Sequence, residues 1–153
     1  MSTSFQLQNN PLKELPHNIE AEQGILGAIL LNNEIFYDVS ETINVEHFYE
    51  PVHKLIFDVI GKMISKGQIA TPITLKSFFE VEKNLEEIGG SNYLVRLANS
   101  AVSLDYAKNY AHIIYNLAVR RGLYELGGRV QHDAIESDIC LLYTSPSPRD
   151  SSQ

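Results

Sequence analysis

The sequence of 153 residues has one cysteine, no tryptophan and no apolar run near the length of a membrane span. One cysteine cannot form an internal disulfide or a cysteine-rich zinc site, which favours the reducing cytoplasm. A membrane-spanning helix needs about 20 mainly apolar residues, so none is predicted. Residues 1–6 contain neither a basic cluster nor an apolar stretch, so no secretory signal is predicted. Together these absences predict a cytoplasmic protein without membrane contact.

Basic residues are fewer than acidic ones. The chain has 12 lysines and arginines against 19 aspartates and glutamates, a net charge of −7 with neutral histidines. Proteins that grip the phosphate backbone of nucleic acids usually present a basic surface. The composition therefore disfavours direct binding of DNA by these residues.

The patterns that hold nucleotides and metals are missing as well. A phosphate-binding loop needs a glycine five residues before a Gly-Lys pair, but Ile56 stands at that distance from Gly61-Lys62. No two histidines have the i,i+3 or i,i+4 spacing of helical metal ligands. No arrangement for nucleophilic catalysis is visible either. The sequence therefore predicts no catalytic residue, cofactor or metal ligand. The histidines are His17, His47, His53, His112 and His132.

Helical periodicity runs from Pro16 to about Glu136, and no run of alternating residues argues for a sheet. We therefore predict an all-α protein, a small helical globule followed by an antiparallel helical hairpin. The tail is rich in serine and proline and has no periodicity, so it is predicted to be disordered and of foreign or read-through origin. The predicted parts are a flexible arm (1–15), the globule (16–103), the hairpin (104–139) with its turn around Arg120–Gly122, and the tail (140–153).

The first predicted helix contains four candidate structural residues. Asn18 suits the N-cap position. Glu22 lies between apolar positions on the face that should meet the core, so we expect a buried anchor that bonds backbone amides or a basic partner. Gly24 and Gly27 belong to a stripe of small residues, against which another segment is expected to pack closely.

His53 follows Pro51 in the first turn of another predicted helix. Its expected role is structural, as a histidine bonded to the backbone of a neighbouring loop. An alternative hypothesis is a small stand-alone helical enzyme, with Glu22 as acid or base and His53 beside it. That alternative requires both side chains to face one cleft.

The stretch from Leu104 to Ala118 is apolar around much of its circumference. Tyrosine and arginine are enriched at protein interfaces, so we favour a protein-binding surface here. A purely internal core is a second possibility, and a base-stacking surface for nucleic acid is disfavoured by the acidity of the chain. The candidate interface residues are Tyr106, Tyr110, Ile113, Ile114, Leu117, Arg120 and Arg121.

Several motifs in order carry a family resemblance. They are LPHNIEAEQGILG (15–27), Phe48-Tyr49 with HKLIF (53–57), ITL (73–75) and GGSNYL (89–94), followed by a helical stretch through Tyr110 and Arg120-Arg121. Over about residues 12–139 the sequence resembles the N-terminal domain of bacterial replicative DNA helicases of the DnaB type.

The resemblance implies a domain that associates through its hairpin into a collar on a hexameric helicase. It also implies that the collar recruits primase and that a helicase loader is a further partner. In that family ATP and Mg²⁺ are bound by a following motor domain. The sequence ends before such a domain, so no ATPase or helicase activity is expected of these residues.

Overall fold

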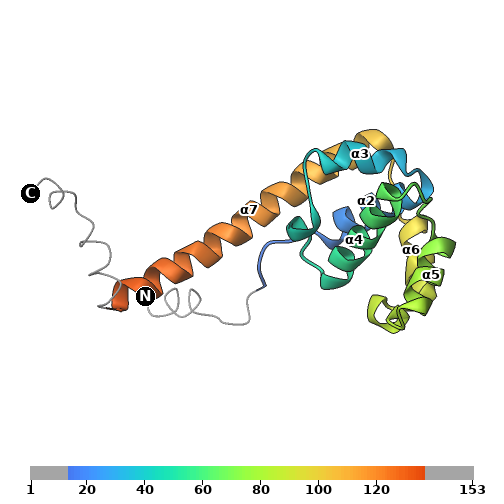
Figure 1. The fold of residues 1–153 in the computed structure, drawn as a ribbon. Coiled ribbons are helices and arrows are strands. Elements are labelled where there is room, and N and C mark those ends of the chain that lie inside the picture. The colour runs from blue at the N-terminus through green and yellow to red at the C-terminus, as the bar shows by residue number, and fades with distance from the viewer. Residues whose placement is uncertain (1–13, 137–153) are drawn as a thin grey trace, which may run out of the picture. The chain divides into compact units, whose positions relative to one another are not determined.

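The computed structural model describes residues 14–136, and every regular element in that range is a helix (Figure 1). The predicted all-α class is thus confirmed. The expected tail, and all but the last two residues of the expected arm, lie outside the described range. The elements are α2 (Ile19–Leu31), α3 (Glu34–Ser40), η1 (Val45–His47), α4 (Pro51–Ser65), α5 (Pro72–Val81), η2 (Leu85–Ile88), α6 (Gly90–Asn99) and α7 (Leu104–Ile135).

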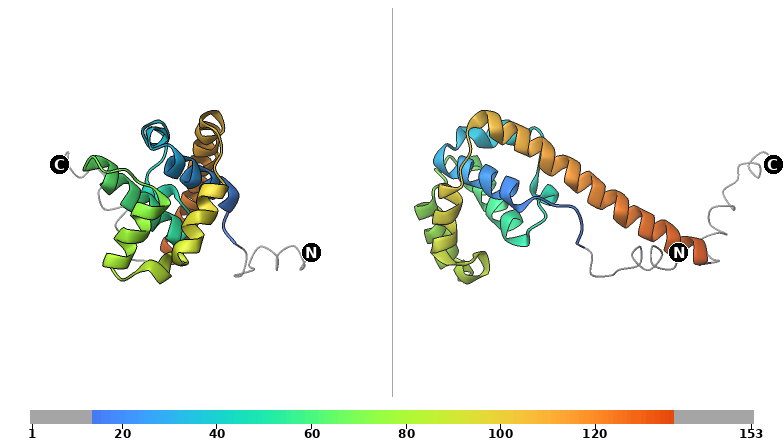
Figure 2. Two further views of the ribbon diagram at one scale, coloured as in Figure 1. Left: turned by 90° about the vertical axis from the view of Figure 1, so that its right-hand side faces the viewer. Right: turned by 180° about the vertical axis from the view of Figure 1, so that it is seen from behind.

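Helix α2 forms the centre of the globule. It begins at Ile19 because the side chain of Asn18 accepts a hydrogen bond of 2.9 Å from the backbone N–H of Ala21. Two glutamates in its first turn face the positive end of the helix dipole. Most of its side chains are buried, and it packs against α6, α4 and α3 (Figure 2). A helix with apolar residues on all sides is typically enclosed in this way.

The other helices of the globule have recognisable start signals. Pro51 occupies the first turn of α4. Thr71 caps α5, and Pro72 follows it in the first turn. The cap position of α6 is occupied by Gly89, with φ 89°. A glycine reaches this left-handed conformation without steric cost, so the chain can turn directly from η2 into α6.

Gly27 marks the closest approach between two segments of the globule. A Cβ atom at this position would lie 1.9 Å from the carbonyl oxygen of Leu97 and 2.9 Å from the backbone nitrogen of Ala101. Only glycine therefore lets α2 meet the end of α6 at this distance. At Gly24 a Cβ would meet the side chains of Val102 and Tyr110 at 3.1 and 3.3 Å. Both glycines have the close neighbours that their stripe led us to expect.

Helix α7 differs from the predicted hairpin. Leu104–Ile135 is one continuous helix, and the expected turn at Arg120–Gly122 lies inside it. One glycine in a helix costs about 1 kcal/mol relative to alanine, and no proline interrupts this stretch, so nothing there forces the helix to end. No helix in the described range is long and apolar enough to cross a membrane.

The chain divides into two compact units, the first ending at Ala118 and the second beginning at Val119. The expected boundary between globule and hairpin was 103/104. The first unit extends further because Ala107, Ala111 and Ile114 of α7 are buried in its core. The beginning of α7 thus belongs to the globule.

Candidate functional site

Two ionisable side chains are buried together inside the globule. Glu22 on α2 is 1% exposed and His53 on α4 is 0% exposed. The carboxylate of Glu22 accepts hydrogen bonds from the backbone N–H groups of Tyr49 (2.7 Å) and Glu50 (3.4 Å), and its Oε1 lies 2.7 Å from His53 Nδ1. A buried carboxylate is tolerated only when such donors replace its water. The geometry is that of an anchor between α2 and the start of α4.

The network continues from His53 to Tyr93 on α6. His53 Nε2 bonds the hydroxyl of Tyr93, and Gln23 Nε2 donates to the same hydroxyl oxygen at 3.2 Å. All donors and acceptors match when Nδ1 carries the proton toward Glu22 and Nε2 accepts from the Tyr93 O–H, which is the tautomer that we assign. The expectation that His53 bonds loop backbone is therefore wrong. Its partners are side chains 31 and 40 residues away.

Tyr93 forms the outer end of this network. Burial raises the pKa of the Tyr93 phenol above its ordinary value of 10.0, the hydrogen bond from Gln23 lowers it, and the carboxylate of Glu50 raises it further. The phenol therefore stays protonated at neutral pH. It keeps the hydrogen that the assigned tautomer of His53 needs.

The alternative hypothesis of an enzyme using Glu22 and His53 fails on burial. The two side chains do touch one another, but both are sealed from solvent and face no cleft. Proton transfer to a substrate requires the acid or base to come within hydrogen-bond reach of it. In residues 14–136 no group of three or more His, Cys, Asp or Glu side chains is placed to hold a metal ion.

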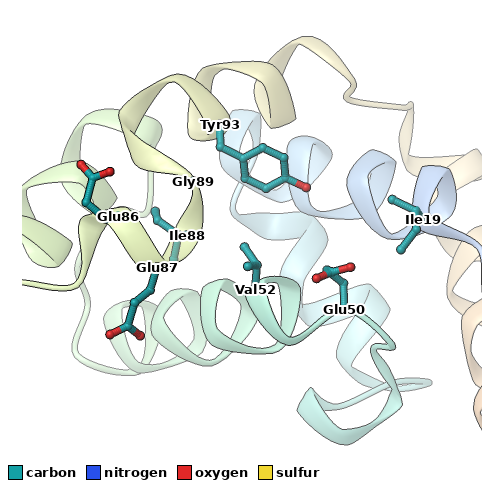
Figure 3. Close-up of a pocket in the computed structure, with 8 residues that line it drawn as sticks. All are labelled: Ile19, Glu50, Val52, Glu86, Glu87, Ile88, Gly89 and Tyr93. Atoms are coloured by element: carbon teal, nitrogen blue, oxygen red, sulfur yellow. The ribbon is translucent and has the colours of Figure 1, made fainter.

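A surface pocket of about 350 Å³ adjoins the outer end of the network (Figure 3). Tyr93 contributes one wall, and Glu50 and Val52 from the start of α4 point into the same space. Ile19 adds apolar surface, Ile88 lies beneath the pocket with no exposed surface of its own, and Glu86, Glu87 and Gly89 complete the lining. Sequence reasoning did not find this pocket, because its residues come from four separate segments of the chain.

The candidate interface residues of α7 are not all on one surface. Ile114 is 1% exposed and belongs to the core, so it is not available as an interface residue in the folded globule. Tyr110 is half-buried against the core, and Leu117 and Arg121 are also half-buried. Tyr106, Ile113 and Arg120 are exposed.

A second set of exposed apolar residues lies further along α7, in the second unit. Leu123 is 60% exposed, and Val119, Leu126 and Val130 are also exposed. These four residues follow one another at intervals of four, three and four, so they share one face of the helix. The sequence shows this periodicity, but the candidate interface set stops at Arg121 and misses it.

The chain matches the family model of the DnaB-like helicase N-terminal domain over residues 14–116. It is 44% identical over 125 residues to the replicative DNA helicase DnaB of Rickettsia felis, covering 82% of this chain and 25% of that protein. The corresponding protein of Treponema pallidum is 28% identical over 135 residues, which cover 85% of this chain and 31% of the relative. The chain thus spans about a quarter of the length of the first of these curated relatives.

Solved structures show the same fold. The crystal structure of the N-terminal domain of DnaB helicase from Mycobacterium tuberculosis superposes with a TM-score of 0.75 and 31% identity, covering 79% of this chain and 84% of that one. A DnaB-like replicative helicase, described with its interactions with primase, superposes with a TM-score of 0.65 and 23% identity. That match covers 82% of this chain and 30% of the other.

Proposed function

We propose that this chain, which belongs to the DnaB-like helicase N-terminal domain family, is an assembly domain of a replicative DNA helicase. In this proposal it self-associates through α7 and docks primase, as part of a hexameric, ATP-dependent helicase in bacterial DNA replication. A helicase loader is a further proposed partner. The site of action is the bacterial cytoplasm.

The main support for self-association is the exposed apolar face of α7. Leu123, Leu126 and Val130 lie on one side of α7. No residue of the second unit is buried in the described range. Contiguous exposed apolar side chains usually mark a surface that another polypeptide covers. An apolar helix face of this kind is commonly covered by a second helix, as in helical bundles and coiled coils.

We assign the binding and hydrolysis of ATP to a separate motor domain of the full-length helicase. Gly61-Lys62, the one Gly-Lys pair of the sequence, lies inside α4 and lacks the preceding glycine of a phosphate-binding loop. Binding of ATP and Mg²⁺ is therefore not proposed for these residues. Primase is proposed as the partner because a helicase of the same fold is described with its interactions with primase.

Sedimentation velocity of the 153-residue chain tests self-association. We expect reversible association in the micromolar range, weakened about tenfold by Leu126→Glu, because a charge in the contact replaces at least 1.4 kcal/mol of apolar burial. The matched control is Ile73→Glu on α5, which places the same charge on another exposed apolar residue and should change nothing. A wild-type chain that stays monomeric at high micromolar concentration contradicts the proposal.

Primase docking is tested separately, by co-migration of the chain with a purified bacterial primase in gel filtration. We expect a complex with the wild-type chain and with Ile73→Glu. Absence of any complex, with wild-type self-association intact, would remove primase from the proposal and leave the assembly role standing.

A further inference from the structure

The pocket beside Tyr93 combines an apolar wall with negative charge. Ile19 and Val52 supply partly exposed apolar side chains, whereas Glu50, Glu86 and Glu87 supply carboxylates. Figure 3 shows Glu50 and Val52 pointing toward the space beside the Tyr93 ring, whereas Glu86 and Glu87 stand at one end of the pocket with their carboxylates pointing away from that ring. A ligand that fits both surfaces must itself have an apolar part and a positive charge.

The carboxylates of the pocket are not used in ion pairs of the globule. Within residues 14–136 the acids that pair with a basic side chain are Glu14, Glu22, Asp38, Glu46 and Asp58. The guanidinium of Arg96 lies 5.6 Å from the centre of the Tyr93 ring but does not line the pocket. The residues that line the pocket include three glutamates and no basic side chain, so its lining is negatively charged.

The buried network fixes two walls of the pocket at once. Glu22 accepts the backbone N–H of Glu50, which holds the start of α4. Through His53 the same carboxylate orients Tyr93 on α6. The two walls are thus held in place before any ligand arrives. A preorganised site loses less conformational entropy on binding than one that has to form around its ligand.

We propose that this pocket receives an arginine side chain from a basic segment of a partner protein. The guanidinium would pair with Glu50, and the aliphatic stem would lie along Val52 and Ile19. A volume of about 350 Å³ is near the small end of ligand sites, which range from roughly 300 to 1,000 Å³, and suits a single side chain.

Charge complementarity identifies the occupant as a basic partner and not a second copy of this chain. The chain has 12 lysines and arginines against 19 aspartates and glutamates, so a second copy is a poorer source of a basic segment than a basic partner. Arginine is favoured over lysine because its planar guanidinium bonds carboxylates with two parallel hydrogen bonds and is more weakly hydrated. This site lies on the first unit and is independent of the proposed function of α7.

The test is an NMR titration of the isotope-labelled 153-residue chain with N-acetyl-arginine-N-methylamide. We expect saturable shifts at the backbone amides of Val52, Ile88 and Gly89. The citrulline counterpart, which has the same shape without the charge, should bind about tenfold more weakly, as expected for the loss of one charge-assisted hydrogen bond. Equal affinity for the two probes overturns the proposal.

Variants locate the binding. Glu50→Gln should lower the affinity for the arginine probe about tenfold, since it removes the charge but keeps the backbone N–H that bonds Glu22. Glu80→Gln, an exposed change on α5 outside the pocket, should leave the affinity unchanged. If Glu50→Gln does not fold, Glu87→Gln takes its place, with a smaller loss expected.

Three outcomes contradict the proposal. In the first, Glu50→Gln, or Glu87→Gln in its place, binds the arginine probe as tightly as the wild-type chain. In the second, the pocket amides shift with protein concentration alone, which makes a second copy the occupant. In the third, Leu126→Glu abolishes probe binding, which ties the signal to self-association and not to the pocket.

Discussion

Helix α2 and the stretch of α7 from Val119 to Ile135 are similar in residue composition but differ in how much of their apolar surface is buried. Each contains glycines, one or two glutamates and several branched apolar residues at helical spacing. In α2 most side chains are buried against α6, α4 and α3, whereas from Val119 onward the apolar side chains of α7 are exposed. Residue type alone therefore does not decide burial. It depends on which elements the rest of the fold supplies as neighbours.

The glycines show the difference most directly. A Cβ added at Gly27 would overlap the backbone of Leu97, whereas at Gly122, Gly127 and Gly128 it would meet nothing within 4 Å. In α2 glycine permits close packing that no other residue allows. In this part of α7 it only lowers the helix propensity of an uncovered segment.

The largest expected effect concerns the buried glutamate of α2. Glu22→Ala removes the acceptor of two backbone N–H groups and of His53, so the free energy of unfolding should fall by about 3–5 kcal/mol. Urea denaturation followed by circular dichroism measures the change. The matched change on α7 is Glu125→Ala, an exposed glutamate that should leave the midpoint unchanged. Equal midpoints for wild type and Glu22→Ala would show that the anchor contributes nothing.

The next comparison exchanges glycine for alanine in both helices. Gly27→Ala should destabilise the globule by about 3 kcal/mol, because the new methyl group forces α2 away from the end of α6. Gly127→Ala should instead stabilise its helix by about 1 kcal/mol, since the methyl group meets no neighbour there.

The two glycine variants need different readouts. Urea denaturation measures the loss in Gly27→Ala, and amide hydrogen exchange along α7 measures the local gain in Gly127→Ala. If both substitutions stabilise the protein, or both destabilise it, the proposed difference in packing between the two helices is wrong.

The smallest effect is a pH dependence. The pKa of Tyr93 is raised in the folded state, so the folded protein holds this proton more tightly than the unfolded chain. The contribution of Tyr93 to stability is complete below about pH 10 and is lost as the pH rises through the raised value. Tyr93→Phe should therefore make the alkaline loss of stability less steep, as urea midpoints from pH 8 upward would show.

Tyr124 on α7 provides the control for the pH experiment. It is exposed and in the second unit, so Tyr124→Phe removes the same hydroxyl without touching the buried network of Glu22, His53 and Tyr93. An identical change of slope in both variants would mean that the environment of Tyr93 has no part in it.

Much of the fold was predictable because its signals are local. Asn18 stands directly before the first apolar-periodic residues, and Pro51 marks a helix start that depends only on the nearest turn. The inward position of Glu22 follows from its spacing to its apolar neighbours. The family motifs predicted the fold that the comparison with solved structures shows.

The site itself was only partly predictable, because its contacts are not local. His53 meets Glu22 and Tyr93 across 31 and 40 residues, and no spacing rule connects such positions. The continuity of α7 through Arg120–Gly122 was missed for a different reason. Glycine weakens a helix without ending it, and whether the chain turns depends on the surrounding structure.

Sequence by itself determined the all-α class, the start of α2 after Asn18 and the family, since these depend on each residue and its near neighbours along the chain. Only the tertiary structure decided that Glu22, His53 and Tyr93 form one network, that a pocket opens beside it, and that Ile114 is buried while Leu123 is exposed. The physical reason is that burial and hydrogen bonding between distant residues depend on how the helices pack, and packing is a property of the whole chain.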